Sequence, residues 1–97
     1  MASNTIGVGI IGLGMGRNAL GINADRNSSL VVRAICDLDE GALARIAGEY
    51  PDEELFQTTE YREVLDRPDI DVVGIYSPDH LHFKHLSDAL EAGKHVI

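Results

Sequence analysis

Basic residues are scarce in this sequence. Lys and Arg number 8 against 16 Asp and Glu, so the formal net charge at pH 7 is −8. Such an excess of negative charge repels the phosphates of nucleic acids and the headgroups of anionic lipids. We therefore expect neither nucleic acid nor a membrane surface among the partners of this chain.

Cysteine and long apolar runs are scarce as well. Cys36 is the single cysteine, which excludes a disulfide within the chain. No apolar run approaches the roughly 20 residues of a membrane-spanning helix. Nor does a basic segment lead into an apolar run with a small-residue cleavage site, as in a signal peptide. We expect a protein of a reducing, cytoplasmic setting.

What the sequence does contain is an alternation of short apolar segments with longer amphipathic ones. Runs rich in β-branched residues predict strands at residues 5–11, 30–36, 55–57, 71–76 and 95–97. The segments between them predict helices at residues 17–26, 40–50, 60–67 and 78–92. Strands and helices that alternate through short loops are typical of the α/β class. The expected fold is a Rossmann-type, doubly wound parallel sheet with helices on both faces.

Capping residues and apolar spacing predict the ends and faces of these helices. Asp39, Thr59 and Ser77 stand where an N-cap side chain would accept hydrogen bonds from backbone N–H groups. Pro78 would open the last helix, and Gly93 would end it at the C-cap. The apolar residues expected to face the core are Leu43, Ile46, Ala47 and Tyr50 in the second helix and Phe83, Leu86, Ala89 and Leu90 in the last.

The strongest chemical signal is the segment GLGMG, which follows the first predicted strand. A glycine turn between a strand and a helix lets backbone N–H groups and the helix N-terminus meet a pyrophosphate. The usual pattern is GxGxxG, but here the third glycine comes one place early. A glycine turn of purely structural purpose would look alike. The candidate pyrophosphate site comprises Gly12, Leu13, Gly14, Met15, Gly16 and Arg17.

Asp37 strengthens this interpretation. It follows the second predicted strand, 21 residues after Gly16, where a carboxylate can accept hydrogen bonds from both hydroxyls of an adenosine ribose. The alternative is an ordinary acid at the end of a strand or the cap of the next helix. A carboxylate would repel a 2′-phosphate, and the next residue is Leu38, not an arginine. The sequence therefore favours NAD over NADP.

The segment SPDHLHFKH, residues 77–85, follows the fourth predicted strand, beside the crevice where ligands of doubly wound sheets bind. His82 and His85 are three residues apart, whereas the helical zinc motif places its histidines four apart with a glutamate between them, so no metal site is predicted. In one interpretation Ser77 and Pro78 only begin the helix, and the histidines cap, hydrogen-bond or face water. We favour another, in which the backbone of residues 77–79 lies against the cofactor.

Together these segments resemble the Gfo/Idh/MocA family of oxidoreductases. VGIIGLGMGR, VVRAICD, DVVGIYSPDHLH and ALEAGKHVI are similar to segments of that family, in the same order and over nearly the whole chain. The resemblance implies an NAD(P)-dependent dehydrogenase that acts on a sugar, inositol or related polyol by hydride transfer. The residues that it assigns to the cofactor are Gly12, Gly14 and Gly16 for the pyrophosphate, Asp37 for the ribose, and Ser77, Pro78, Asp79 and His82 for the rim.

The resemblance also indicates what residues 1–97 would lack. Asp79 stands where Asn is common in the family, and Ala19 where many members have His. The next family motif after Ile97 is Glu-Lys-Pro, whose lysine serves proton transfer, followed by an α+β domain that binds substrate and forms the oligomer. The chain is thus expected to be an incomplete NAD(P)-binding Rossmann domain, truncated in its fifth strand. It would bind cofactor without catalysing, and no catalytic residue is assigned to it.

Two other functions share parts of this pattern. A non-catalytic NAD-binding sensor or regulatory module would have the same fold and the same loop. An S-adenosylmethionine-dependent methyltransferase would have a GxGxG loop and an acid after the second strand. Such enzymes usually carry an acid two residues before the first glycine, where this sequence has Ile10.

Overall fold

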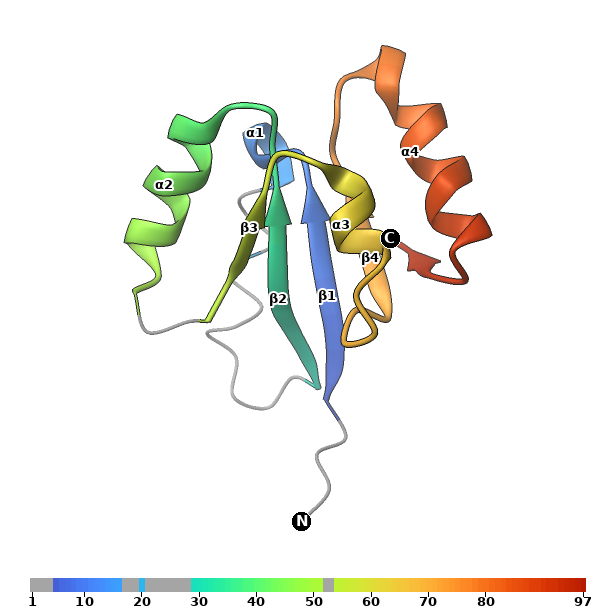
Figure 1. The fold of residues 1–97 in the computed structure, drawn as a ribbon, viewed down its shortest axis with the longest axis horizontal. Coiled ribbons are helices and arrows are strands. Elements are labelled where there is room, and N and C mark those ends of the chain that lie inside the picture. The colour runs from blue at the N-terminus through green and yellow to red at the C-terminus, as the bar shows by residue number, and fades with distance from the viewer. Residues whose placement is uncertain (1–4, 17–19, 21–28, 52–53) are drawn as a thin grey trace.

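The computed structural model of the chain describes residues 5–16, 20, 29–51 and 54–97. Within them a single sheet of five parallel strands has the order β3-β2-β1-β4-β5 (Figure 1). The strands are β1 (Ile6–Ile11), β2 (Leu30–Cys36), β3 (Phe56–Thr58), β4 (Val72–Ile75) and β5 (His95–Val96). This order confirms the predicted Rossmann-type sheet, because the chain fills one side of β1 and then crosses to the other.

The central strand β1 sets the edge at which a ligand can bind. All of its residues after Ile6 are buried, and it pairs with β2 on one side and β4 on the other. Ile11, its last residue, lies opposite Cys36 of β2 and Ile75 of β4. The carboxyl ends of these strands therefore meet at one edge of the sheet, where parallel α/β folds bind their ligands.

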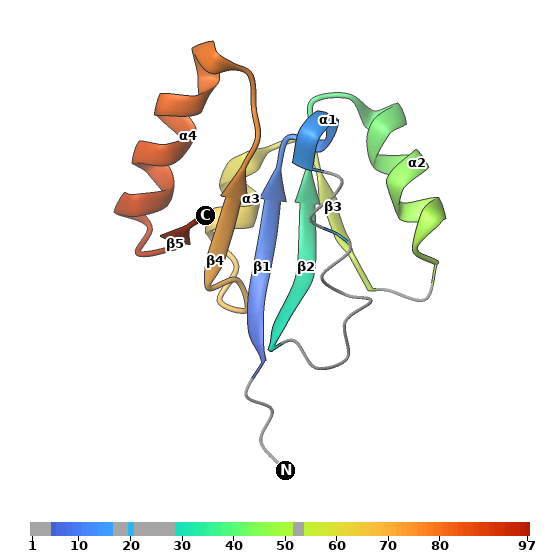
Figure 2. The same ribbon diagram turned by 180° about the vertical axis from the view of Figure 1, so that it is seen from behind.

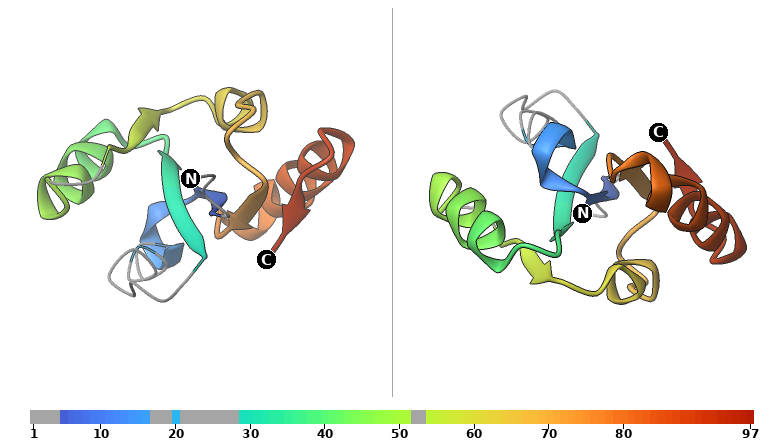
Figure 3. Two further views of the ribbon diagram at one scale, coloured as in Figure 1. Left: turned by 90° about the horizontal axis from the view of Figure 1, so that it is seen from below. Right: turned by 90° about the horizontal axis from the view of Figure 1, so that it is seen from above.

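The helices cover both faces of the sheet, as predicted. They are α1 (Leu13–Gly16), α2 (Glu40–Glu49), α3 (Tyr61–Leu65) and α4 (Asp79–Glu91). Figure 3 shows α1 and α3 on opposite faces, and Figure 2 shows α1 at the carboxyl ends of β1 and β2. None of the helices in the described ranges is long and apolar enough to cross a membrane.

Each face of the sheet has its own apolar core. The core beneath α1 and α2 consists of aliphatic side chains: Val8, Ile10, Leu13, Leu20, Val32, Ile35, Ala42, Leu43 and Ile46. The core beneath α3 and α4 contains Ile11, Ala34, Cys36, Val64, Leu65, Ile70, Val73, Ile75 and Ala89. Burial of apolar side chains on both faces stabilises the parallel sheet with its covering helices.

Several predicted helix starts are wrong by a few residues. The helix α1 begins at Leu13, inside the segment expected to be a turn, while the predicted helix 17–26 falls almost entirely outside the described residues. Helix α2 begins after Asp39, whose carboxylate accepts from the N–H groups of Gly41 and Ala42, as predicted. Helix α3 is capped by Glu60 instead of Thr59.

The shift at α3 has a local cause. Strand β3 ends at Thr58, one residue later than predicted, and Thr58 is buried. Its hydroxyl accepts from the N–H of Glu60 at 2.9 Å and contacts the carboxylate of Glu63. Thr58 therefore makes the connection between strand and helix, and Thr59 is left exposed.

Helix α4 differs from its prediction at both ends. Its N-cap is Pro78, not Ser77, and within the described part of the chain its start has no side-chain cap hydrogen bond. Its C-cap is Ala92, not Gly93, and Gly93 follows with φ +80°. A glycine directly after the C-cap commonly takes this left-handed conformation and turns the chain out of the helix. Here the turn leads into β5.

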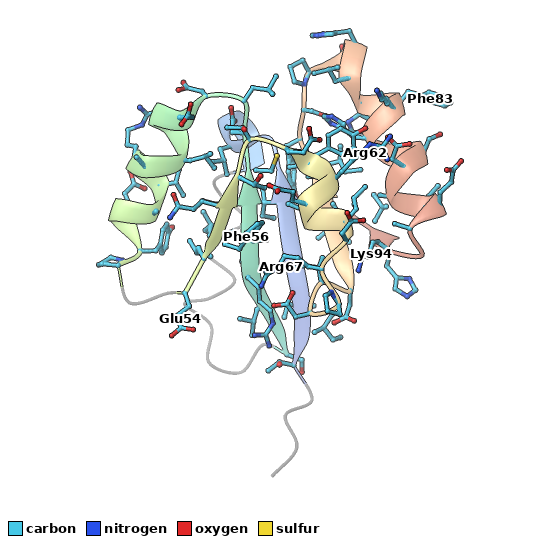
Figure 4. All side chains as sticks on the ribbon, viewed as in Figure 1. Glu54, Phe56, Arg62, Arg67, Phe83 and Lys94 are labelled. Carbon is cyan, nitrogen blue, oxygen red and sulfur yellow. The ribbon has the colours of Figure 1, made fainter. Side chains whose placement is uncertain are left out.

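The buried face of α4 was predicted correctly in part: Ala89 is buried and Leu86 packs against the core, as expected, whereas the other two predicted residues are exposed. Phe83 and Leu90 are 76% and 59% exposed, and Figure 4 shows Phe83 pointing away from the sheet. His85, which was not predicted to face the core, is buried beside Ala89. At 100° per residue His85 and Ala89 share one stripe, while Phe83 and Leu90 form another about 130° away, more than a third of a turn.

Lys94 fixes the turn that precedes β4. Its ammonium group donates to the carbonyl oxygens of Arg67 at 2.8 Å and Ile70 at 2.5 Å (Figure 4). The guanidinium of Arg67 in turn lies 4.4 Å from the centre of the Phe56 ring. These contacts join β3 and the residue before β5 to the loop between α3 and β4.

Candidate functional site

A cavity of about 780 Å³ opens at the carboxyl ends of the strands. Its wall is formed by residues that follow β1, β2, β3 and β4 and by the first turns of α4. The right-hand view of Figure 3 looks down on this end of the sheet. The cavity has the volume of a typical small-molecule or cofactor site and lies where the strand order reverses.

Gly12 lies at the end of β1 and is required by the fold itself. Its φ is +93°, and a Cβ built there would lie 2.7 Å from the carbonyl carbon of Tyr76 and 2.8 Å from the nitrogen of Ser77. Its N–H donates to the carbonyl of Cys36 at 2.9 Å. The backbone after β1 therefore packs directly against the connection between β4 and α4, a contact that only glycine permits.

Gly14 lines the same cavity for a different reason. It is exposed, and a Cβ built on it would meet no atom within 4 Å. Neither conformational strain nor packing within the described residues requires glycine at this position. What a side chain at Gly14 would fill is space at the first turn of α1, beside the cavity.

Asp37 stands beside this turn, half-buried in the wall of the cavity. Its Oδ2 accepts from the N–H of Leu13 at 2.8 Å, and its Oδ1 accepts from the N–H of Asp39 at 2.9 Å. Because a carboxylate offers about four acceptor positions, these two bonds leave room for two more donors. Asp37 thus ties the end of β2 to the glycine loop and still presents acceptors to a ligand.

The structure brings most of the predicted site residues to one place. Gly12, Gly14, Asp37, Ser77, Pro78 and Asp79 all line the cavity. Leu13 contributes its backbone N–H, while its side chain is buried in the core. Met15 and Gly16 belong to α1, and Arg17 lies outside the described residues. His82 is exposed and is not among the residues that line the cavity.

His85 is the most deeply buried polar residue among the cavity residues that the sequence analysis did not select. It is only 7% exposed, and its Nδ1 is hydrogen-bonded to Oγ of Ser77 at 2.7 Å. Its ring centre lies 4.2 Å from that of Tyr61, with the two planes at 49°. One sequence signal could have identified His85: it is a polar residue on the same helical stripe as Ala89. A histidine buried there needs a hydrogen-bond partner nearby.

The surroundings of His85 disfavour its protonated form. Burial lowers the pKa of His85, and the positive charge of Lys84 and the neighbouring His82 act in the same direction, while Asp88 opposes them. Asp88 is itself engaged, because it accepts from the hydroxyl of Tyr61 and pairs with Arg62 at 3.0 Å. At neutral pH we therefore expect a neutral imidazole in the wall of the cavity.

Cys36 also lines the cavity, and its surroundings disfavour the reactive thiolate. Burial, reinforced by the negative charges of Asp37, Glu60 and Glu63, raises the pKa of its thiol to about 12. The reactive form of cysteine is the thiolate, which is scarce under these conditions at neutral pH. Cys36 contributes packing at the end of β2.

Comparison with known proteins identifies relatives of the same architecture. The profile of a family described as "Oxidoreductase family, NAD-binding Rossmann fold" matches residues 6–97. The uncharacterized oxidoreductase YrbE of Bacillus subtilis is 33% identical over 89 residues, which are 92% of this chain and 26% of that protein.

Two solved structures illustrate the cofactors that such relatives bind. Scyllo-inositol dehydrogenase of Lactobacillus casei, solved with NAD(H) and scyllo-inositol, superposes with a TM-score of 0.79 at 30% identity, over 95% of this chain and 27% of that one. Biliverdin reductase of Synechocystis, solved with biliverdin and NADP+, gives 0.80 at 28% identity, over 94% and 28%.

The chain thus spans about a quarter of the length of these relatives, with 26% of YrbE and 27% of the inositol dehydrogenase covered. Within that span, the order of the strands and the glycine loop after β1 agree with the matched profile of a Rossmann fold. The resemblance noted in the sequence is confirmed, and the chain belongs to the Gfo/Idh/MocA family of oxidoreductases with an NAD-binding Rossmann fold.

Proposed function

We propose that this chain is the dinucleotide-binding part of an NAD-dependent oxidoreductase that oxidises a hydroxyl of a sugar, inositol or related polyol. The observation that carries the proposal is Gly14, a glycine that the described fold does not need, placed at the cavity between Asp37 and Ser77. The absence of a side chain there leaves room for the backbone to approach a pyrophosphate.

The residues in the cavity suit each part of a dinucleotide. The pyrophosphate would lie over the glycine loop, against the first turn of α1, whose N–H groups have no partner within the helix. The adenosine ribose would donate to the remaining acceptor positions of Asp37. The nicotinamide half would extend to the other side of β1, along residues 77–79. The bound nicotinamide supplies the hydride acceptor.

The preference for NAD over NADP is part of this proposal. Asp37 would repel a 2′-phosphate, and Leu38, which also lines the cavity, is 77% exposed and carries no charge to attract one. The solved relatives include complexes with either cofactor, so the preference rests on these two residues of the chain itself.

The substrate class rests on the relatives. The inositol dehydrogenase was solved with a polyol, scyllo-inositol, whose hydroxyl is suitable for oxidation by hydride transfer. We assign the polyol site, the proton-transfer lysine and the oligomer contacts of the whole enzyme to segments other than these 97 residues. On this proposal the 97-residue chain binds cofactor without catalysing. A cytoplasmic setting stays a prediction from the single cysteine.

Calorimetric titration of the chain with NAD+, NADP+ and S-adenosylmethionine tests the proposed function. We expect binding of NAD+, weaker binding of NADP+, and none of S-adenosylmethionine. Equal or tighter binding of NADP+ would contradict the role given to Asp37. Tight binding of S-adenosylmethionine without binding of NAD+ would contradict the proposed function as a whole.

A further inference from the structure

A buried polar cluster lies on the β4 side of the cavity and consists of His85 with its two contacts, Ser77 and Tyr61. Thr58 and His85 are the buried polar residues within the described ranges, and Thr58 serves the turn between β3 and α3. His85 has no such local duty. It lies inside α4, one turn before Ala89, and it lines the cavity.

The contacts of His85 connect the cavity wall to two helices. Its hydrogen bond to Ser77 spans the connection between β4 and α4, and its ring packs on Tyr61 of α3. Tyr61 is itself fixed, because its hydroxyl donates to Asp88 and the guanidinium of Arg62 lies 5.5 Å from its ring centre. The imidazole is therefore held in place from both α3 and α4, and it holds the side chain of Ser77.

Ser77 is well placed to contact a ligand on this side of the cavity. It is half-buried and lines the cavity. A hydroxyl can donate one hydrogen bond and accept two, so the bond to His85 leaves part of this capacity for a ligand. Because β1 lies between β2 and β4, a dinucleotide with its adenosine at Asp37 would extend its other half toward Ser77.

We propose that His85 is a positioning residue for the nicotinamide ring of the dinucleotide, because it fixes the hydroxyl of Ser77 in the cavity wall. This inference rests on the proposed function. In either tautomer of His85 the hydrogen bond persists, with Ser77 as acceptor in one and donor in the other. A fixed hydroxyl loses less conformational freedom when it binds a ligand, and the ligand binds more tightly for that reason.

The test compares NAD+ with ADP-ribose, which lacks the nicotinamide. His85→Leu removes the hydrogen bond and keeps an apolar side chain in the helix. We expect it to weaken NAD+ binding by about tenfold, the scale of one hydrogen bond, and to change ADP-ribose binding by less than about twofold. His85→Asn retains a polar group near the position of Nδ1 and should keep NAD+ binding within about threefold of the unmutated chain. His95→Leu, the same change at an exposed histidine in β5, is the matched control.

Ser77→Ala tests the pair independently of how well the His85 variants fold. It should weaken NAD+ binding at least as much as His85→Leu, because it removes the hydroxyl that would contact the ligand, and the double variant should bind no more weakly than Ser77→Ala, since His85 acts through that hydroxyl. Additive losses would overturn the inference. So would equal losses for NAD+ and ADP-ribose, which would indicate a purely structural role, or NAD+ binding by His85→Leu at the unmutated affinity.

Failure of the inference and failure of the proposed function are distinguishable. If the unmutated chain, folded by circular dichroism, bound neither NAD+ nor ADP-ribose, the proposed function would be wrong, and the inference with it. If the unmutated chain bound both ligands but His85→Leu left the NAD+ affinity unchanged, only the inference would be wrong.

Discussion

The two sides of the cavity are built from different kinds of groups. On the side of β1 and β2, the wall consists of backbone around Gly12 and Gly14 and of one carboxylate, Asp37, all close to strand ends. On the side of β4, it depends on Ser77, which is held by His85 from the second turn of α4. Groups whose position follows from a local backbone motif can be predicted from the sequence. The position of a side chain that is held by tertiary contacts cannot be predicted in the same way.

The largest effect should come from Gly12, where the two sides touch. Gly12→Ala would force a side chain into the left-handed region and against the backbone of Tyr76. Backbone strain of this kind costs about 1–3 kcal/mol, and the close contact adds about as much. We expect the free energy of unfolding, measured by urea denaturation, to fall by about 3 kcal/mol. An unchanged denaturation midpoint would show that the two connections do not pack as described.

Gly14→Val should instead abolish binding and spare the fold. A Cβ at this position would meet no atom of the described residues within 4 Å, so the free energy of unfolding should change by less than about 1 kcal/mol. The same side chain would occupy the space proposed for the pyrophosphate, so NAD+ affinity should fall by about 100-fold or more. Calorimetry and circular dichroism on one sample measure both quantities. Unchanged affinity in a folded variant would remove the glycine loop from the site.

Asp37→Ala should weaken the binding of any ligand that contains the adenosine ribose. Loss of charge-assisted hydrogen bonds to the ribose is expected to reduce NAD+ binding by about 1–3 kcal/mol. ADP-ribose, which keeps this ribose, should lose as much, in contrast to the selective loss expected for His85→Leu. Asp39→Ala is the matched control, because Asp39 caps α2 and does not line the cavity. It should lower stability by about 0.5–2 kcal/mol and leave NAD+ affinity unchanged.

The same contrast explains how much of the fold was predictable. The strands were predicted within a residue or two because runs of β-branched residues buried on both faces have few other interpretations. Gly12, Gly14 and Asp37 were found because the motif places them at consecutive strand ends. The sequence offers no comparable local pattern for the contact between Tyr61 and His85, which joins separate helices.

The errors in α4 have the same origin. Apolar spacing predicted Phe83 and Leu90 in the core, but the helix turns His85 inward and leaves both exposed. In that orientation the imidazole is hydrogen-bonded to Ser77 and packs on the ring of Tyr61. The spacing of apolar residues carries no information about these contacts. Ser77 was assigned as the N-cap for a related reason, because a serine before Pro78 fits the capping pattern when its tertiary partner is unknown.

The smallest predicted effect concerns the pH dependence of stability on the β4 side. Burial lowers the pKa of His85 in the folded chain below its usual value of about 6.5, with Asp88 opposing this shift and His82 and Lys84 adding to it. Tyr61 faces it from α3. Above pH 6.5 the imidazole is neutral in both states and its hydrogen bond contributes fully. As the pH falls below 6.5, the unfolded chain takes up the proton first, so stability is lost toward the folded-state pKa.

Urea unfolding at pH 7.5 and pH 5.5 measures this loss. The unmutated chain should lose more stability between the two values than His85→Leu, because the variant lacks the titrating imidazole while all other groups remain. His95→Leu should behave like the unmutated chain, since His95 is exposed and lies outside the cluster. If His85→Leu and the unmutated chain lost stability in parallel, His85 would be free to protonate in the folded state. The hydrogen bond between His85 and Ser77 would then persist with a protonated ring. The stability of the β4 side would not depend on pH between 7.5 and 5.5, as is expected of backbone contacts on the side of β1.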